Sequence, residues 1–329
     1  MQYRLLHFSE FKLQIKKLLL SVHHLSWLHR CVAHLYFFIY WHHVLNAYNV
    51  INRIVTAFLN YFYPMYKLKK SLGQHFLKDE VIIQKIMAAL KETSFTHLLE
   101  VGPGGGALTK ELIKIKDIEF KAVELDEEKI AALIKQYPTL HDKIISNNFL
   151  DIDKPFDQPF TVIGNFPYNI STQILFKLLE WEHDVPVIIG MFQKEVAQRA
   201  AASPGGKIYG VLSALLQPFY TIEYLFDVPP ESFNPPPKVQ SGVIKLTQKT
   251  DVLAVRSERS YKILVKTAFN QRRKTLRNAV KSLFTPAELQ APIFSRRAET
   301  LSIQEFAELT FKMVGNPPAV SRQLSNDDL

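Results

Sequence analysis

The chain has 329 residues, a length that corresponds to about two domains. With 47% hydrophobic and 22% charged residues, its composition excludes a disordered, collagen-like or purely coiled-coil chain. Its one cysteine, Cys31, excludes a disulfide framework and a multi-cysteine zinc site. Forty basic residues against 31 acidic ones give a net charge of +9, which suits a polyanionic partner, either nucleic acid or an acidic membrane.

Residues 1–64 differ in composition from the rest of the chain. They hold seven of the eleven histidines and a single acidic residue, Glu10. The longest stretch free of Lys, Arg, Asp and Glu, residues 31–52, contains three His and three Asn, which makes it a poor membrane span. We interpret residues 1–64 as an extension outside the native fold, which then starts at Met65, and we expect neither a metal site nor a stable membrane association. A membrane or targeting segment is the alternative.

From residue 67 to residue 249, apolar segments of strand and helix length alternate. The pattern predicts strands over residues 97–101, 120–125, 143–145, 160–164, 185–191, 220–226 and 242–246. It predicts helices over residues 81–90, 107–115, 127–136, 170–181 and 194–201. Such alternation indicates the α/β class with a doubly wound, mostly parallel, Rossmann-like sheet, in a domain of residues 65–250. We expect a smaller, basic helical domain over residues 251–315 and a polar tail over residues 316–329.

A glycine-rich turn follows the first of these predicted strands. Glu100, Gly102, Gly104 and Gly106 stand at every second position between strand and helix. Glycines in such a turn tolerate positive φ and let a ligand approach the backbone, and the helix start offers free N–H groups. Glu124 ends the next predicted strand, where a carboxylate accepts hydrogen bonds from both ribose hydroxyls of an adenosine. The pair indicates a nucleoside-bearing cofactor without separating nicotinamide dinucleotides from S-adenosylmethionine.

The motif Asn165-Phe166-Pro167-Tyr168 follows the fourth predicted strand. These four residues are the candidate catalytic residues, because they suit a flat base with an exocyclic amine. We expect the Asn165 side-chain oxygen and the backbone carbonyl of Phe166 or Pro167 to accept the two hydrogens of an adenine N6, which makes that nitrogen more nucleophilic. Tyr168 would stack on the base, a contact worth about 1–3 kcal/mol. The motif favours S-adenosylmethionine and a methyl transfer that depends largely on positioning.

Several motifs match one family in order along the chain. They are SLGQHFL (residues 71–77), LEVGPGGGALT (99–109), VELD (123–126), GNFPYNIS (164–171), FNPPPKVQSGVIKL (233–246) and FNQRRKTLRN (269–278). With these motifs the chain closely resembles the ribosomal RNA small-subunit adenine dimethyltransferases, the KsgA family, from about Lys69 to about Leu309. The resemblance implies a class I methyltransferase fold and S-adenosylmethionine as methyl donor, without a metal.

The resemblance also implies the roles of single residues. The implied cofactor-binding residues are His75, Leu77, Gly102, Glu124, Asn148 and Asn165. Among them, His75 and Leu77 would line the methionine and sulfonium side of the pocket, with Gln74 beside them. Leu125 would pack on the cofactor adenine, and Asn165 would bridge the cofactor and the target amine.

One position departs from the family pattern. The family usually has Gly-Asp after the third strand, with the aspartate bonded to the adenine amine of the cofactor, whereas this chain has Asn147-Asn148. Asn148 can still accept that bond through its side-chain oxygen, but a neutral hydrogen bond is weaker than a charge-assisted one. We therefore expect somewhat weaker cofactor binding with activity retained, and we expect Asn148→Asp to strengthen the binding.

The region after residue 251 is rich in basic residues. The candidate RNA-binding residues, which we expect on one face of a single helix together with Lys281, are Arg272, Arg273, Lys274 and Arg277. They would neutralise RNA phosphates. The substrate of the family that the chain resembles is a pair of adjacent adenines in the 3′-terminal hairpin of small-subunit (16S) ribosomal RNA, within a pre-30S particle. We accordingly expect N6,N6-dimethylation of both adenines by a monomeric, cytoplasmic enzyme that acts in small-subunit maturation.

Three other functions stay open on sequence alone. A large-subunit ribosomal RNA adenine methyltransferase that confers macrolide resistance shares the glycine turn and an Asn-x-Pro-Tyr motif, although residues 233–246 and 272–278 favour the small-subunit group. A non-catalytic assembly or transcription factor would keep the fold and the RNA binding, and the intact motif at residues 165–168 argues against it. A nicotinamide oxidoreductase would need a hydride site, and no such constellation accompanies the glycine turn.

Overall fold

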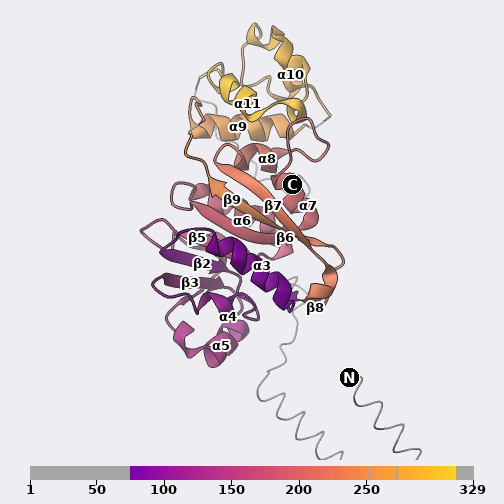
Figure 1. Cartoon of the computed structure of the whole chain (residues 1–329). Helices are drawn as coiled ribbons and strands as arrows, with labels where there is room; N and C mark the ends of the chain where they lie inside the picture. Colours follow the sequence, from indigo (N-terminus) through magenta and orange to yellow (C-terminus); the bar gives the residue numbers. More distant parts are fainter. Residues whose placement is uncertain (1–74, 252, 272, 316–329) are drawn as a thin grey trace, which may run out of the picture. The chain divides into compact units, whose positions relative to one another are not determined.

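The computed structural model describes residues 75–315 except 252 and 272, all of them within the compact unit Lys67–Leu329 (Figure 1). The predictions for residues 1–64, Gln74, Arg272 and the tail 316–329 lie outside the described residues. Within the described part of the chain, no helix combines the length and the apolar character that crossing a membrane requires.

Seven strands form one sheet in the order β4-β3-β2-β5-β6-β9-β7 (Figure 1). The strands are β2 (His97–Val101), β3 (Glu119–Glu124), β4 (Ile144–Ser146), β5 (Thr161–Asn165), β6 (Val187–Gln193), β7 (Tyr220–Val228) and β9 (Ser241–Gln248). Strands β2 to β6 are parallel, and β9 runs antiparallel between β6 and β7. The predicted doubly wound, mostly parallel α/β sheet is confirmed, and every predicted strand overlaps an observed one.

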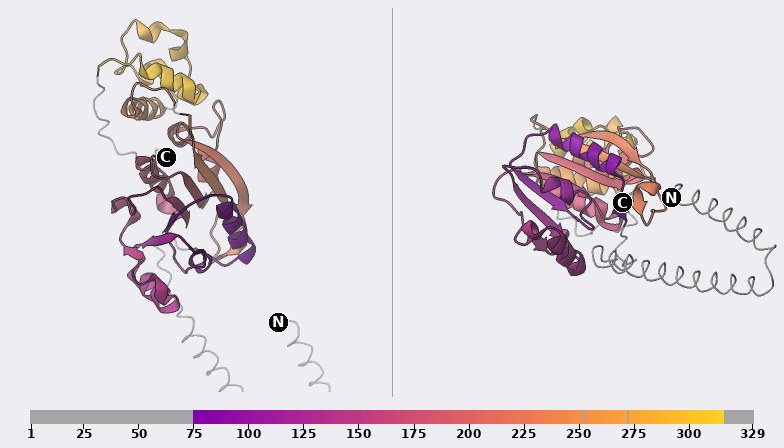
Figure 2. Two further views of the ribbon diagram at one scale, coloured as in Figure 1. Left: turned by 60° about the vertical axis from the view of Figure 1, so that its left-hand side comes forward. Right: turned by 60° about the horizontal axis from the view of Figure 1, so that its bottom comes forward.

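The two faces of the sheet bury two separate hydrophobic clusters. Leu99 and Val162 belong to one cluster, and their chain neighbours Leu98 and Ile163 belong to the other. Successive side chains of a strand face opposite ways, so strands covered on both faces are apolar throughout. The helices that supply the covering layers (Figure 2) are α3 (Glu80–Lys91), α4 (Thr109–Leu112) and α5 (Glu127–Gln136) in the second cluster, and α6 (Ser171–Glu180), α7 (Lys194–Ala200) and α8 (Val211–Leu216) in the first.

Some local features differ from the prediction. The helix expected over residues 107–115 is only α4, which is flanked by turns. Gly106, at φ +80°, donates its N–H to the Pro103 carbonyl at 2.8 Å, and this tight turn delays the regular helix. The short strands β1 (Phe76–Leu77) and β8 (Phe233–Asn234), which pair antiparallel, were not predicted, nor was α8.

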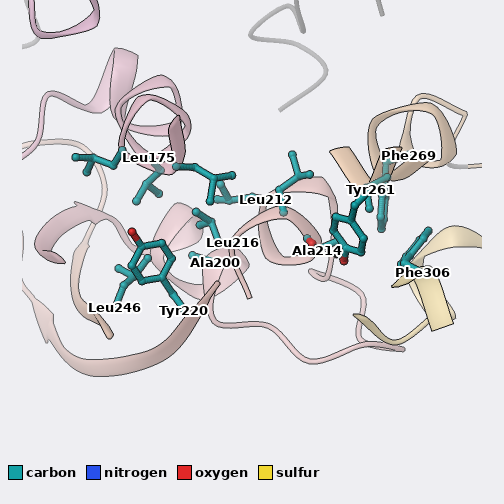
Figure 3. Packing of buried hydrophobic residues seen from close by; sticks show 14 of the residues in the cluster. Leu175, Ala200, Leu212, Ala214, Leu216, Tyr220, Leu246, Tyr261, Phe269 and Phe306 are labelled. Atoms are coloured by element: carbon teal, nitrogen blue, oxygen red, sulfur yellow. Dashed lines mark hydrogen bonds between the residues drawn. The ribbon is translucent and has the colours of Figure 1, made fainter. Parts of the chain in front are cut away.

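The C-terminal part is helical, as expected, with α9 (Glu258–Phe269), α10 (Leu276–Ala279) and α11 (Ile303–Thr310) joined by turns. These helices share a continuous hydrophobic core with α8 (Figure 3). Tyr261 of α9 is buried in this core, and its hydroxyl donates to the Ala214 carbonyl of α8 at 2.9 Å. The basic C-terminal part is therefore packed directly against the layer formed by α6 to α8.

Candidate active site

The glycine turn and the Asn-Phe-Pro-Tyr motif meet at the carboxyl ends of two neighbouring strands. Because β2 and β5 are parallel neighbours, Gly102 and Asn165 lie at the same edge of the sheet. Gly102 has φ +71°, and a β-carbon there would lie 3.7 Å from Pro167 Cδ and 3.9 Å from the Asn165 carbonyl oxygen. The two motifs thus lie about one side-chain atom apart, as a joint site for a cofactor and a base requires.

Glu124 is buried beside the glycine turn, at the end of β3. Its Oε2 accepts the Gly104 N–H at 3.1 Å. Its Oε1 accepts the N–H groups of Leu125 at 3.0 Å and Asp126 at 3.1 Å, and the Lys129 ammonium lies 3.7 Å from the same oxygen. These donors hold the carboxylate in one orientation next to the turn, where ribose hydroxyls can donate to it.

Two further residues with an implied cofactor contact flank Glu124. Leu125 is 55% exposed, so it offers an open apolar surface to a flat ring. Asn148 follows β4, and its side-chain oxygen accepts the Leu150 N–H at 3.2 Å while its amide nitrogen donates to Asp151 Oδ2 at 2.8 Å. The Asn148 side chain is therefore paired with the carboxylate of Asp151, a contact that sequence reasoning missed.

The Asn-Phe-Pro-Tyr motif combines side chains that face the site with one that anchors it. The Asn165 amide nitrogen donates to the His75 carbonyl at 3.3 Å, which leaves the amide oxygen for a substrate amine. The Phe166 ring is buried and packs on Phe192 with the ring centroids 4.9 Å apart. Phe166 is therefore available to a substrate only through its backbone.

His75 and Tyr168 form a stacked pair, with ring centroids 5.6 Å apart and planes at 28°. The His75 Nδ1 lies 2.9 Å from the Pro235 carbonyl oxygen, next to the pairing of β1 with β8. Burial raises the pKa of Tyr168, and a hydrogen bond with Ser241 partly offsets this effect, so the phenol is neutral at physiological pH. The Leu77 side chain packs in the hydrophobic core, and its contact with the cofactor stays a prediction.

Glu100, the first residue of the glycine motif, lies beneath the turn. It is only 1% exposed, and the Thr109 hydroxyl donates to its carboxyl at 2.8 Å. Burial raises the pKa of Glu100 to about 8, with the hydrogen bond acting against this shift and the charge of Glu124 adding to it. At neutral pH Glu100 is mostly protonated, so it joins the turn to α4 without placing a second charge beside Glu124.

The predicted RNA-binding residues do not share one helix, so that part of the prediction is wrong. α9 ends at Phe269, and the Lys274 N–H then closes a turn on the Gln271 carbonyl at 2.8 Å. Asn270 is the C-cap residue of α9, and the next helix, α10, begins only at Leu276. Arg273 and Lys274 are exposed within this turn.

The two remaining basic candidates differ, because one is bonded within the fold and the other is exposed. Arg277 lies on α10, and its Nε donates to the Leu289 carbonyl at 2.8 Å, so it helps to hold the fold of this region. Lys281 is exposed after the end of α10. Phosphate contact by Arg273, Lys274 and Lys281 stays a prediction.

Sequence reasoning also missed two side chains beside the cofactor turn. Phe76 lies against the turn, since a β-carbon on Gly105 would be 3.1 Å from its ring. The buried Lys129 ammonium lies 5.8 Å from the centre of the same ring and pairs with Glu124. The sequence held a signal for Lys129, because it precedes the buried Leu133 by one helical turn, on the face of α5 where a core side chain is expected.

Comparison with known proteins identifies the family. The family model described as ribosomal RNA adenine dimethylase matches residues 65–313 of the chain. The chain belongs to this family. A relative of this adenine dimethylase, the ribosomal RNA small subunit methyltransferase A of Cytophaga hutchinsonii, is 49% identical over 253 residues, which cover 76% of this chain and 98% of that protein.

Solved structures agree with membership in the adenine dimethylase family. A dimethyladenosine transferase from Plasmodium falciparum has a TM-score of 0.60 at 26% identity, over 71% of this chain and 96% of that chain. The 23S rRNA methyltransferase ErmE has a TM-score of 0.55 at 22% identity, over 72% and 99%, which shows a shared fold. The expected family, the class I methyltransferase fold and the methyltransferase activity are confirmed, while the roles of single residues stay predictions.

Proposed function

We propose that this adenine dimethylase transfers methyl groups from S-adenosylmethionine to N6 of two adjacent adenines in the 3′-terminal hairpin of small-subunit ribosomal RNA. It acts as a cytoplasmic monomer on a pre-30S particle, during small-subunit maturation. The observation that supports the proposal most directly is that Gly102 lies close to the backbone of Asn165 and to Pro167, at the same edge of the sheet, because the residue that carries the candidate amine-binding amide is then next to the cofactor turn. A relative named small subunit methyltransferase A, at 49% identity, supports the choice of substrate.

The residues around the glycine turn fit the cofactor. Gly102, Gly104 and Gly106 all have positive φ, from +56° to +80°, so the turn favours residues without a side chain and leaves its backbone open to a ligand. Glu124 offers its carboxylate to the ribose hydroxyls, and the exposed Leu125 offers an apolar surface to the adenine. When bound, S-adenosylmethionine supplies an electrophilic methyl group on a sulfonium.

The target amine needs its lone pair freed from conjugation with the adenine ring. We assign the Asn165 side-chain oxygen and the Phe166 carbonyl as acceptors of its two hydrogens, since the Pro167 carbonyl already accepts the Ile170 N–H at 3.3 Å. Two such acceptors favour a tetrahedral, nucleophilic nitrogen. The reaction then needs neither a general base nor a metal ion, because the nitrogen loses its proton to water once it carries the methyl group.

Tyr168 receives the target base on one face of its ring, because His75 stacks on the ring at 5.6 Å and occupies the other face. Stacking of a base on an aromatic side chain is worth about 1–3 kcal/mol. This gain offsets part of the cost of taking the adenine out of its helical stack. The exposed Arg273 and Lys274 hold the RNA through its phosphates.

Methylation assays on unmodified small subunits and on naked large-subunit RNA test the proposal. We expect methyl transfer to the small subunits alone, with mass spectrometry finding dimethyladenosine at two adjacent positions. Methylation of naked large-subunit RNA would instead assign the macrolide-resistance activity. Asn165→Ala is the control variant, which should bind small subunits without methylating them. A wild-type protein that binds subunits without methylating them would be a non-catalytic assembly factor and would contradict the proposal.

A further inference from the structure

We infer that Ser241 is a positioning residue for the methyl transfer, because it holds the far end of the Tyr168 ring in the place where the ring receives the target base. The inference deepens the proposed function and rests on it, since it requires that Tyr168 stacks on the base. Tyr168 begins the short 3-10 turn after β5, and Ser241 is the first residue of β9, 73 residues later. No contiguous motif joins the two positions.

The hydroxyl oxygens of Tyr168 and Ser241 are 2.5 Å apart, a hydrogen-bond distance. Ser241 is 0% exposed, and its backbone is fixed between two strands, opposite Gln193 of β6 and Val228 of β7. The turn that carries Tyr168 has no fully buried residue. The hydrogen bond therefore ties the end of a partly exposed side chain to a rigid point inside the sheet.

Two other contacts leave the Tyr168 ring a single open face. The Ser171 hydroxyl donates to the Tyr168 carbonyl at 3.1 Å, which fixes the backbone end of the residue. The His75 ring stacks on one face, and its own Nδ1 lies 2.9 Å from the Pro235 carbonyl. The stacked His75 ring sets the plane of the Tyr168 ring, and the bond to Ser241 fixes where the far end of that ring lies and hence where a base stacked on it lies.

This arrangement has a kinetic consequence. Without this bond the far end of the ring can shift, and the amine of a base stacked on it then moves out of line with the methyl donor; a misplacement of about 1 Å can slow a reaction by about 10²-fold. We expect Ser241→Ala to lower the rate of methyl transfer by at least about tenfold. The KM for S-adenosylmethionine should change little, because Ser241 contacts Tyr168 and not the cofactor turn.

A double-mutant cycle tests the inference. Single-turnover methyl transfer to unmodified small subunits is measured for the wild type, Ser241→Ala, Tyr168→Phe and the double variant. If Ser241 acts through the Tyr168 hydroxyl, both single variants are slowed by a similar factor and the double variant is no slower than Tyr168→Phe. An unchanged rate in Ser241→Ala, or effects that multiply in the double variant, would overturn the inference.

Controls separate this result from folding defects and from failure of the proposed function. Ser260→Ala removes another buried serine hydroxyl, which lies in α9 and contacts the N-cap residue Ser257, and should leave the rate unchanged. Should Ser241→Ala fail to fold, Ser241→Cys takes its place in the cycle, because a thiol is of similar size but a weaker donor, and an intermediate rate is expected. A wild-type protein that does not methylate small subunits would overturn the proposed function. If the wild type is active but the rate effects of the two single substitutions multiply in the double variant, only the role of Ser241 is overturned.

Discussion

Among single residues, Glu100 makes the stability of the protein depend on pH in a definite direction. Burial raises its pKa from 4.5 to about 8, so between these values the folded protein binds a proton that the unfolded chain has lost. The stabilising contribution is complete below pH 4.5 and is lost as the pH rises through about 8. Across this window the free energy of unfolding falls by at most about 1.4 kcal/mol per pH unit.

Glu100→Gln removes this titration and keeps an oxygen for the Thr109 hydroxyl. We expect the variant to lose less stability than the wild type as the pH rises from about 5 to about 8. Urea unfolding of both proteins across this range measures the difference, in which the titrations of all other groups cancel. If the wild type and Glu100→Gln lost the same stability across this pH range, the pKa of Glu100 would not be raised in the folded protein.

Asn148 gives a second prediction at this scale, because its amide donates to Asp151 at 2.8 Å. This contact changes the outcome expected for Asn148→Asp, since two carboxylates would then face each other at hydrogen-bond distance. We expect the single variant to bind S-adenosylhomocysteine no more tightly than the wild type. Asn148→Asp combined with Asp151→Asn should bind it about 3- to 10-fold more tightly.

Isothermal titration calorimetry compares these variants, with Asp151→Asn alone as the matched control. The control should bind like the wild type, because it keeps a side chain that can accept from the Asn148 amide. An equal gain in Asn148→Asp with and without the second substitution would show that Asp151 has no influence on this site.

Among the elements, the turn after β5 is positioned by the packing beneath it. A β-carbon on Gly190 of β6 would lie 2.4 Å from Cε2 of Phe166, and one on Gly164 would lie 2.8 Å from Cε1 of the same ring. Atoms at these distances overlap, so both positions require glycine as long as the ring stays in place. Because Phe166 lies between Asn165 and Pro167, its packing sets the position of the groups that we propose to bind the amine.

Gly190→Ala should therefore lower both stability and activity. Overpacking of a buried ring costs about 1–3 kcal/mol, which corresponds to a fall in Tm of roughly 2–12 °C for a protein of this size. Methyl transfer should slow as well, because Phe166 can move only together with Asn165. Gly210→Ala is the matched control, since nothing lies within 4 Å of a β-carbon there. Calorimetric melting and single-turnover rates that match the wild type in Gly190→Ala would refute this packing account.

The elements that sequence patterns predicted are those whose signal is local. The strand at residues 97–101 is buried on both faces, and its apolar run predicted the observed bounds. β1 and β8 are two residues long and exist only through pairing with each other across the chain, which no local pattern indicates. Helix α8 was missed because nearly all of its residues are buried, so it lacks the polar face that marks an amphipathic helix.

The candidate site divides in the same way. Glu124 and Asn165 could be predicted because they end parallel strands, and such ends meet at one edge of a sheet. Ser241 and Asp151 could not, since their roles depend on which way a side chain points across the site. The predicted basic helix face was wrong because α9 ends at Phe269 and the chain turns before α10, and helical spacing alone does not reveal where a helix ends.

For the molecule as a whole, one hydrophobic cluster joins the sheet to the C-terminal helices (Figure 3). Tyr220 and Leu246 on the sheet belong to the same cluster as Phe269 and Phe306 on α9 and α11. A continuous core of this kind gives the basic turn after α9 a fixed relation to the catalytic edge. RNA phosphates held at that turn would position the hairpin before its adenines enter the site.

Arg273→Ala combined with Lys274→Ala should weaken binding to small subunits and make it less sensitive to salt. Each lost phosphate contact lowers the slope of log K against log salt by about 0.7–0.9, so we expect a change of roughly 1.5. Lys116→Ala is the matched control. Lys116 is exposed and precedes β3, so it lies at the edge of the sheet opposite to the candidate active site. A salt slope equal to that of the wild type would exclude phosphate contacts at this turn.

In the proposed reaction, the Asn165 amide binds the target amine while the glycine turn presents the methyl donor beside it. The most direct measurement is a crystal structure of the protein with sinefungin and an RNA hairpin that carries the two adenines. We predict Asn165 Oδ1 at about 3 Å from the adenine N6, with the base stacked on Tyr168. An Asn165 amide directed away from both ligands would contradict the account.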